Sequence, residues 1–176
     1  MSSPRPEPTA EDRQALLGMI GGFSATQILY AAARVGVVDL VRSGQNNVAT
    51  LAASLSLPPD RLGRFLRMLV VIGVLEEDGR AGFGVTRRGE LLATDHPESL
   101  VDHILHVGEI SYEVARHVTA AIATGRPAFD VQFGLPLFDY LASSPEARVR
   151  FDNLMADATR GRIEAILSAH DFRQAR

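Results

Sequence analysis

The segment from Val48 to Arg88 constrains the fold of this chain more than any other. VATLAASLSL predicts a short helix, Pro58-Pro59-Asp60 redirect the backbone, and RLGRFLRMLVVIG predicts a second helix. VLEEDGRAGFGVT then predicts a β-hairpin that folds back on these helices. Helix, turn, helix and hairpin in this order predict a winged helix-turn-helix, an architecture typical of proteins that bind DNA.

The charge of the chain argues against nucleic acid as its partner. The formal net charge is −3, whereas DNA-binding domains usually present a basic face. The second helix does carry Arg61, Arg64 and Arg67, spaced three apart and therefore on one side. The acidic run at 76–78 lies at the base of the hairpin, where it would repel phosphates. We interpret the arginines as a solvated helix face and keep a DNA-binding transcription regulator as an alternative.

Composition is that of an ordinary folded protein. Hydrophobic residues make up 46% of the chain and charged residues 22%, which excludes a mainly disordered chain. Zero cysteines exclude disulfides, thiolate metal sites and cysteine nucleophiles. The longest apolar run, near Leu69, is far shorter than the ~20 residues that span a bilayer, and no signal peptide opens the chain. We therefore expect a cytoplasmic protein without a membrane segment.

Helices are predicted through most of the remaining sequence. The residues before Ala10 hold three prolines and no apolar periodicity, so they predict a disordered arm. The predicted helices are Ala10–Ile20 and Phe23–Val35, broken by Gly21-Gly22; Val37–Arg42; a turn or two within 86–94; Ser99–Val107 and Glu109–Thr124, split near Gly108; Leu137–Ala142; and Pro145–His170. A turn-rich loop is predicted at 125–136. The helix Phe23–Val35 has almost no polar face, which indicates burial against another subunit.

Two histidines are the best candidates for metal ligands. His103 and His106 are three residues apart, and Glu109 and Glu113 follow on the same segment. Such spacing can supply two ligands from one helix face. A third ligand would have to come from beyond Gly108, so we expect no metal site.

The sequence offers no catalytic constellation. No Gly-x-Gly-x-x-Gly or P-loop pattern follows a predicted strand. Asp102, Ser111 and His117 lie close together in sequence, but nothing orders them as a triad beside an oxyanion site. We therefore assign no catalytic residue.

Four segments together resemble one known family. The segments are Gly22–Leu40, Arg64–Glu77, Val85–Leu100 and Gly125–Met155. They look like the N-terminal region of S-adenosylmethionine-dependent small-molecule O-methyltransferases, which tailor plant phenolics and bacterial polyketides or antibiotics. The segments follow the order of the family from about Ala10 to Phe172. The resemblance depends on all of them together, because no single motif would identify the family.

The resemblance implies a mainly α fold: a helical dimerisation domain whose winged helix, with a small hairpin wing, does not bind DNA. It divides the chain into an arm at 1–10, a dimerisation region at 11–100 with the winged helix at 48–88, a substrate-capping region at 101–172 and a tail at 173–176. In the family, a following Rossmann-like domain holds S-adenosylmethionine and the catalytic base. Residues 170–173 resemble the sequence just before that domain, so we expect no Rossmann domain here and no cofactor binding by this chain alone.

The resemblance also implies residues that face the ligands of the complete enzyme. Leu137, Leu141, Phe151 and Met155 match positions that line the pocket for a small aromatic acceptor, and Thr159 matches one near the cofactor. These apolar side chains suit a flat aromatic ring. They suit plain core packing equally well, because pockets are lined mostly by apolar groups.

The chain departs from the family pattern at two places. Ala115 stands where many bacterial members have tryptophan, and the chain has no tryptophan at all. The segment 130–133 lacks the histidines that are common there. The resemblance therefore leaves the shape of the acceptor open.

Three functions follow as hypotheses. The first is a dimerisation and substrate-capping domain, a homodimer that is not catalytic by itself. The second is the DNA-binding regulator that uses the three arginines of the second helix. The third is a stand-alone partner that forms a heterodimer with a full-length methyltransferase.

Overall fold

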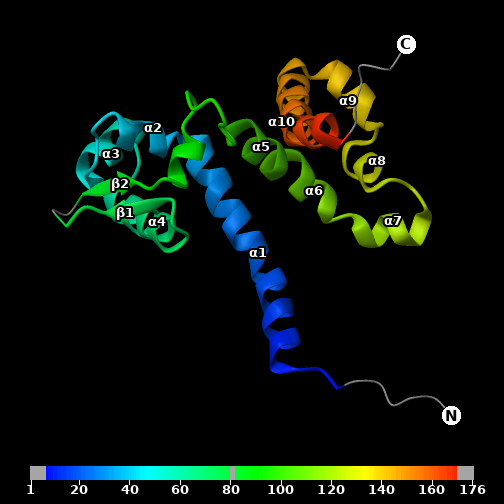
Figure 1. The fold of residues 1–176 in the computed structure, drawn as a ribbon, viewed down its shortest axis with the longest axis horizontal. Helices are drawn as coiled ribbons and strands as arrows, with labels where there is room; N and C mark the ends of the chain where they lie inside the picture. The colour runs from blue at the N-terminus through cyan, green and yellow to red at the C-terminus, as the bar shows by residue number, and fades with distance from the viewer. Residues whose placement is uncertain (1–6, 80–81, 170–176) are drawn as a thin grey trace.

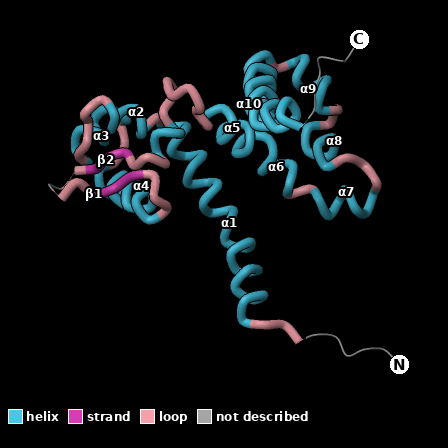
Figure 2. The backbone as a smooth tube through the Cα atoms, viewed as in Figure 1, coloured by secondary structure: helices cyan, strands magenta, loops and turns pink. Residues whose placement is uncertain are grey.

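The structure is a computed structural model of the 176-residue chain, and it describes residues 7–79 and 82–169. It is mainly helical, with one small two-stranded sheet (Figure 2). A long first helix, α1, runs out from the junction of two helical groups, one on each side of its C-terminal end (Figure 1). Most of the predicted arm and the whole predicted tail at 173–176 lie outside the described residues.

Helix α1 spans Ala10–Val35 without interruption. Thr9 and Asp12 form a capping box at its start, and Gly36 ends it with a left-handed φ of 65°. The predicted break at Gly21-Gly22 is therefore wrong. Glycine weakens a helix interior by only about 1 kcal/mol, whereas a break would leave the backbone groups of two new helix ends unpaired.

The first helical group contains the predicted succession of helix, turn, helix and hairpin. Its elements are α2 (Val37–Arg42), α3 (Val48–Leu55), α4 (Pro59–Val71), β1 (Leu75–Glu77), β2 (Phe83–Val85) and the short 3-10 helix η1 (Gly89–Leu92). Asn47 caps α3 by accepting a hydrogen bond from the Thr50 amide at 3.0 Å. The strands pair antiparallel, with Leu75 opposite Val85. The core of this group is built on fully buried leucines from α3, α4 and β1: Leu51, Leu62, Leu66, Leu69 and Leu75.

The second helical group differs from its prediction in three places. Its elements are α5 (Val101–His106), the π-helix η2 (Val107–Ser111), α6 (Tyr112–Ala115), α7 (Val118–Thr124), α8 (Ala128–Phe133), α9 (Leu137–Ser143) and α10 (Pro145–Ala169). The predicted split near Gly108 is a π-helix, and the chain instead leaves the helix between Ala115 and Val118. The predicted loop at 125–136 contains α8, because its Pro and Gly residues cap a helix.

Gly108, the second residue of η2, lies at a close contact with α1. A Cβ atom at this position would overlap the ring of Tyr30 on α1. Only glycine permits so close an approach of η2 to α1. The widened turn therefore lies where the second helical group is packed directly on α1.

Candidate functional site

The N-terminal half of α1 exposes a group of large apolar side chains. Leu16, Met19, Ile20 and Phe23 are 59%, 75%, 67% and 56% exposed. Residues 25–35, in contrast, are mostly half-buried against the two helical groups, and Ala32 is fully buried. The sequence predicted the uncovered helix surface at 23–35, but most of it lies one to two turns earlier.

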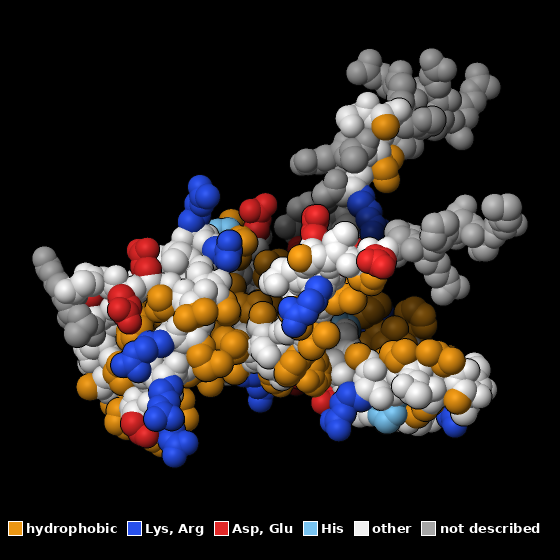
Figure 3. Space-filling model, turned by 90° about the horizontal axis from the view of Figure 1, so that it is seen from below, with side chains coloured by type: hydrophobic (Ala, Val, Ile, Leu, Met, Phe, Trp, Pro, Cys, Tyr) orange, Lys and Arg blue, Asp and Glu red, His pale blue; other side chains and the backbone are white. Residues whose placement is uncertain are grey.

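Figure 3 looks at the molecule from the side toward which α1 projects. Hydrophobic side chains cover much of this face, and isolated charged side chains separate them. Apolar surface of this extent normally marks an interaction site.

Helix α1 is also long and apolar enough, by length and composition alone, to cross a membrane, and only 6% of its most apolar window is buried. The sequence did not predict a helix of this length and composition, because only uninterrupted apolar runs were counted. Glycines and small polar residues interrupt those runs, yet no charged residue lies between Arg13 and Arg34. The core helix of a soluble protein passes the same test, so it is weak evidence for a membrane segment.

The outward face of α4 mixes charge with apolar surface. Arg61, Arg64 and Arg67 are exposed there, as the sequence predicted. Met68 and Val71 share this face and are 45% and 86% exposed. The helix therefore presents an interrupted basic row instead of the continuous polar surface that suits a phosphate backbone.

The second helical group gathers three of the residues matched to an acceptor pocket. Leu141 is buried, and Leu137 and Phe151 are half-buried, in one cluster from η2, α6, α8, α9 and α10. The Phe151 ring lies edge-on to Phe138 at 6.5 Å between centroids, and Phe138 is 74% exposed. We name Phe138, Phe151 and the adjoining His106 the aromatic wall. It runs from the buried cluster to the surface.

Met155 and Thr159 do not join this cluster. Met155 is 43% exposed, and Thr159 is exposed one turn farther along α10. The Thr159 hydroxyl donates to the backbone carbonyl of Met155 at 2.6 Å, so it is engaged within its own helix. The residue matched to the cofactor is thus an exposed hydroxyl that already donates within its own helix.

His106 is a wall residue that the sequence considered only as a metal ligand. Its side chain is buried, its ring lies 5.7 Å from that of Phe151, and its Nδ1 has no hydrogen-bond partner. Burial lowers its pKa below the usual 6.5, and nearby His103 and Arg150 lower it further against the opposing effect of Glu109. The lowered pKa and the contact with the Phe151 ring both favour the uncharged imidazole at this position. The described residues contain no group of three or more side chains that could hold a metal ion.

The candidate triad also separates into other contacts. Asp102 accepts a hydrogen bond from Asn153 at 2.6 Å, and His117 pairs with Gln132. These partners lie on α10 and α8, so the polar groups join helices to one another. In this arrangement, Asp102 and His117 hold helices together and do not form a triad with Ser111.

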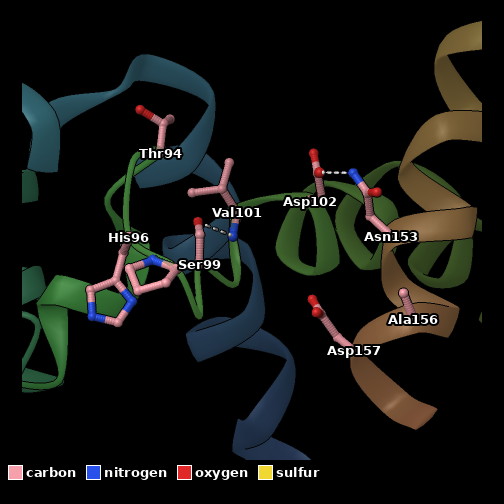
Figure 4. Close-up of a pocket in the computed structure, with 9 residues that line it drawn as sticks. Thr94, His96, Ser99, Val101, Asp102, Asn153, Ala156 and Asp157 are labelled. Carbon is pink, nitrogen blue, oxygen red and sulfur yellow. Dashed lines mark hydrogen bonds between the residues drawn. The ribbon is translucent and has the colours of Figure 1, made fainter. Parts of the chain in front are cut away.

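A polar cavity of about 270 Å³ lies between the η1–α5 connection and α10. Figure 4 shows the Asp102–Asn153 bond at its edge and Asp157 beneath it, with Thr94, His96 and Ser99 across the gap. Thr94 is itself held by Asp39 of α2 through two hydrogen bonds of 3.0 and 2.9 Å. The cavity thus offers carboxylate, amide and hydroxyl groups at the boundary between the two helical groups.

Residues 17–95 match the family of O-methyltransferase dimerisation domains. The chain carries an O-methyltransferase dimerisation domain. The matched residues begin within the exposed half of α1 and end just beyond η1.

The similarity extends beyond the dimerisation domain into the second helical group. Phenazine O-methyltransferase PhzM of Lysobacter antibioticus is 36% identical over 157 residues, which are 89% of this chain and 46% of that enzyme. The crystal structure of N,N-8-amino-8-demethyl-D-riboflavin dimethyltransferase from Streptomyces davawensis has a TM-score of 0.84 at 29% identity. The match covers 94% of this chain and 50% of that one.

A third relative has a structure with its ligands bound. An O-methyltransferase from neocarzinostatin biosynthesis, in complex with S-adenosylmethionine and 2-hydroxy-5-methyl naphthoic acid, gives a TM-score of 0.70 at 28% identity, covering 84% of this chain and 46% of that one. The chain spans about half the length of the curated relatives it matches. The dimerisation domain and the helices after it correspond to part of such an enzyme.

Proposed function

We propose that this chain is the dimerisation and acceptor-capping part of a methyltransferase that modifies a small aromatic metabolite. Two copies pair through the exposed half of α1, and the aromatic wall covers one side of the acceptor. The cofactor and the reaction belong to a Rossmann-like domain of the kind that follows in the family, so the chain by itself is not catalytic. The exposed apolar half of α1, within a dimerisation domain, is the observation that carries this proposal.

The distribution of side chains around α1 supports pairing. Leu16, Ile20 and Phe23 lie on one side of the helix, and Gly18 and Gly22 lie on the other. Apart from the adjacent residues and the backbone of α1 itself, no atom of the described residues lies within 4 Å of the Cβ position at either glycine. A helix that lacks a polar side gains stability when another subunit covers it, at roughly 25 cal/mol per Å² of buried apolar area.

Light scattering tests the pairing. The wild-type chain should have twice its 19.0 kDa mass at micromolar concentration. Ile20→Glu places a charge in the apolar surface and should yield monomer, whereas Gln14→Glu adds the same charge to an exposed position of the same helix and should remain dimeric. A wild-type monomer would contradict the proposal.

A membrane is the competing partner for α1. Flotation with vesicles of neutral phosphatidylcholine distinguishes a membrane from a second copy as the partner of α1. A dimer that covers α1 should remain at the bottom of the gradient and not float with the vesicles. Co-flotation of the wild-type chain, abolished by Ile20→Glu, would assign this helix to lipid and overturn both the pairing and a cytoplasmic location.

The aromatic wall supports the acceptor-capping part of the proposal. Phe138 and Phe151 offer ring faces and edges to a flat ligand, and two of the relatives act on, or bind, fused aromatic rings by name. Because the proposal assigns the cofactor to another domain, titration calorimetry of this chain with S-adenosylmethionine should give no binding heat. Micromolar affinity would contradict the assignment of the cofactor to another domain.

A heterodimer uses the same surface. The surface of α1 that pairs with itself can also pair with α1 of a related methyltransferase subunit. To test this, the tagged chain is mixed with an untagged full-length relative, and the amount of relative that co-purifies with the tag is measured. If the tagged chain pairs with itself and carries no relative, the homodimer is favoured.

The three arginines of α4 keep a DNA-binding winged helix as the second candidate. Duplex binding at low salt that falls steeply with added salt, and is lost in Arg64→Gln with Arg67→Gln, would support it. Absence of binding at low salt would remove it.

A further inference from the structure

Glu109 joins two helices that are far apart in the sequence. One carboxylate oxygen pairs with Arg34 near the end of α1 at 3.4 Å, and the other pairs with Arg150 on α10. The second terminal nitrogen of Arg150 pairs with Glu146 on its own helix. The Arg150 side chain is only 14% exposed, so solvent screens this end of the link less than an ordinary surface pair.

The backbone around Glu109 is held by packing as well as by charge. Glu109 lies in the π-helix η2, a rare winding that is frequent at functional sites. The neighbouring Gly108 lies directly against the Tyr30 ring of α1. Movement of α1 relative to η2 would therefore disturb a tight contact and an ion pair together.

The far end of the link adjoins the aromatic wall. Arg150 precedes Phe151, whose ring contacts His106 and lies edge-on to Phe138. A shift or rotation of α10 that broke the Arg150–Glu109 pair would also move the Phe151 ring. The Phe151 ring therefore moves with the helix that Arg150 ties to Glu109.

We propose that Glu109 is a positioning residue that ties α10 to α1, so that pairing of two chains along α1 fixes the place of Phe151 in the aromatic wall. This inference rests on the proposed function, which supplies both the pairing of α1 and the role of the wall. It adds a route by which the assembly state controls the shape of the acceptor surface.

Amide hydrogen exchange of the whole chain tests the inference. Exchange at residues 147–152 is measured at protein concentrations above and below the dimer dissociation constant, with the mass followed by light scattering. In the wild-type chain, dimerisation should slow exchange at these residues on the order of tenfold, because ordering of α1 reaches α10. Glu109→Gln should still dimerise, since the exposed half of α1 is untouched, but its exchange should no longer depend on concentration.

Two further variants separate positioning from simple loss of stability. Arg34→Gln removes only the α1 end of the link at an exposed side chain and should also abolish the concentration dependence. Glu113→Gln is the matched control: its ion pair with Arg116 is local to one short segment, so the concentration dependence should persist. The proton resonances of the His106 ring, shifted by the Phe151 ring current, should follow the same pattern.

The outcomes distinguish the inference from the function on which it rests. A dimer whose exchange at 147–152 is the same at all concentrations, or a Glu109→Gln variant that behaves as wild type, overturns the inference and leaves the proposed pairing intact. A wild-type chain that stays monomeric overturns both.

Discussion

At the scale of single residues, Gly108 is a position where the sequence has little freedom. Gly108→Ala should lower the free energy of unfolding by about 1–3 kcal/mol, because the new methyl group overlaps the Tyr30 ring. Gly63→Ala is the control: it is also a helical glycine, but its Cβ would lie 3.7 Å from Val48, an ordinary contact. Urea denaturation measures both. Equal stability of the two variants would show that η2 and α1 are not in close contact.

His106 gives the protein a pH dependence whose sign follows from its burial. Its pKa is lowered in the folded chain from the usual 6.5, so the unfolded chain binds the proton more readily. The contribution of His106 is therefore present above pH 6.5 and is lost as the pH falls below 6.5 toward the lowered pKa. His106→Phe should lose less stability than wild type between pH 7 and pH 5, as measured by urea denaturation at each pH. An equal loss in both proteins would place the imidazole in water.

At the scale of elements, sequence rules worked where a start signal and an apolar period agree, as in α3, which Asn47 caps, and in α4 and α10, which begin with proline. They failed at Gly21-Gly22, at Gly108 and in the loop at 125–136, each time because Gly or Pro was interpreted as a break. The same residues can continue, widen or cap a helix. Contacts with distant residues decide among these outcomes, as the Tyr30 ring does for Gly108, and local sequence does not contain them.

Phe151 and Met155, the two residues of α10 matched to the acceptor pocket, should respond differently when their side chains are replaced by alanine. Phe151→Ala should cost about 2–3 kcal/mol, less than the 3–5 kcal/mol typical of fully buried rings, because the ring is half-buried in the second cluster. Met155→Ala should change stability by less than about 0.5 kcal/mol, since Met155 is 43% exposed. Thermal unfolding of both variants provides the comparison. A large effect at Met155 would mean that another subunit or domain covers it in solution.

At the scale of the whole molecule, the sequence located the groups of residues but not the links between them. It placed Leu137, Leu141 and Phe151 in one helical region, and they do meet in one cluster. It could not find the pairs of Glu109 with Arg34 and Arg150, which are separated by 75 and 41 residues. Without periodicity or a motif to join such positions, only the folded chain brings them together.

The buried side chains form two clusters, and this predicts two units of stability. Leu66 is completely buried in the cluster of α1 to η1, and Leu141 is 3% exposed in the cluster of η2, α6, α8, α9 and α10. Leu141→Ala should cost about 2–5 kcal/mol, because the truncation leaves a cavity. Since the two clusters share no residue, that loss should open mainly the second helical group.

Native-state hydrogen exchange distinguishes this from unfolding of the whole chain. In Leu141→Ala, protection should fall at α8, α9 and the start of α10 while the amides of α3 and α4 keep their wild-type protection. Leu66→Ala is the reciprocal variant and should release α3, α4 and the hairpin first. Uniform loss of protection in both variants would mean that the contacts through α1 and η2 couple the clusters into one cooperative unit. The link at Glu109 would then support the stability of the whole chain in addition to the position of α10.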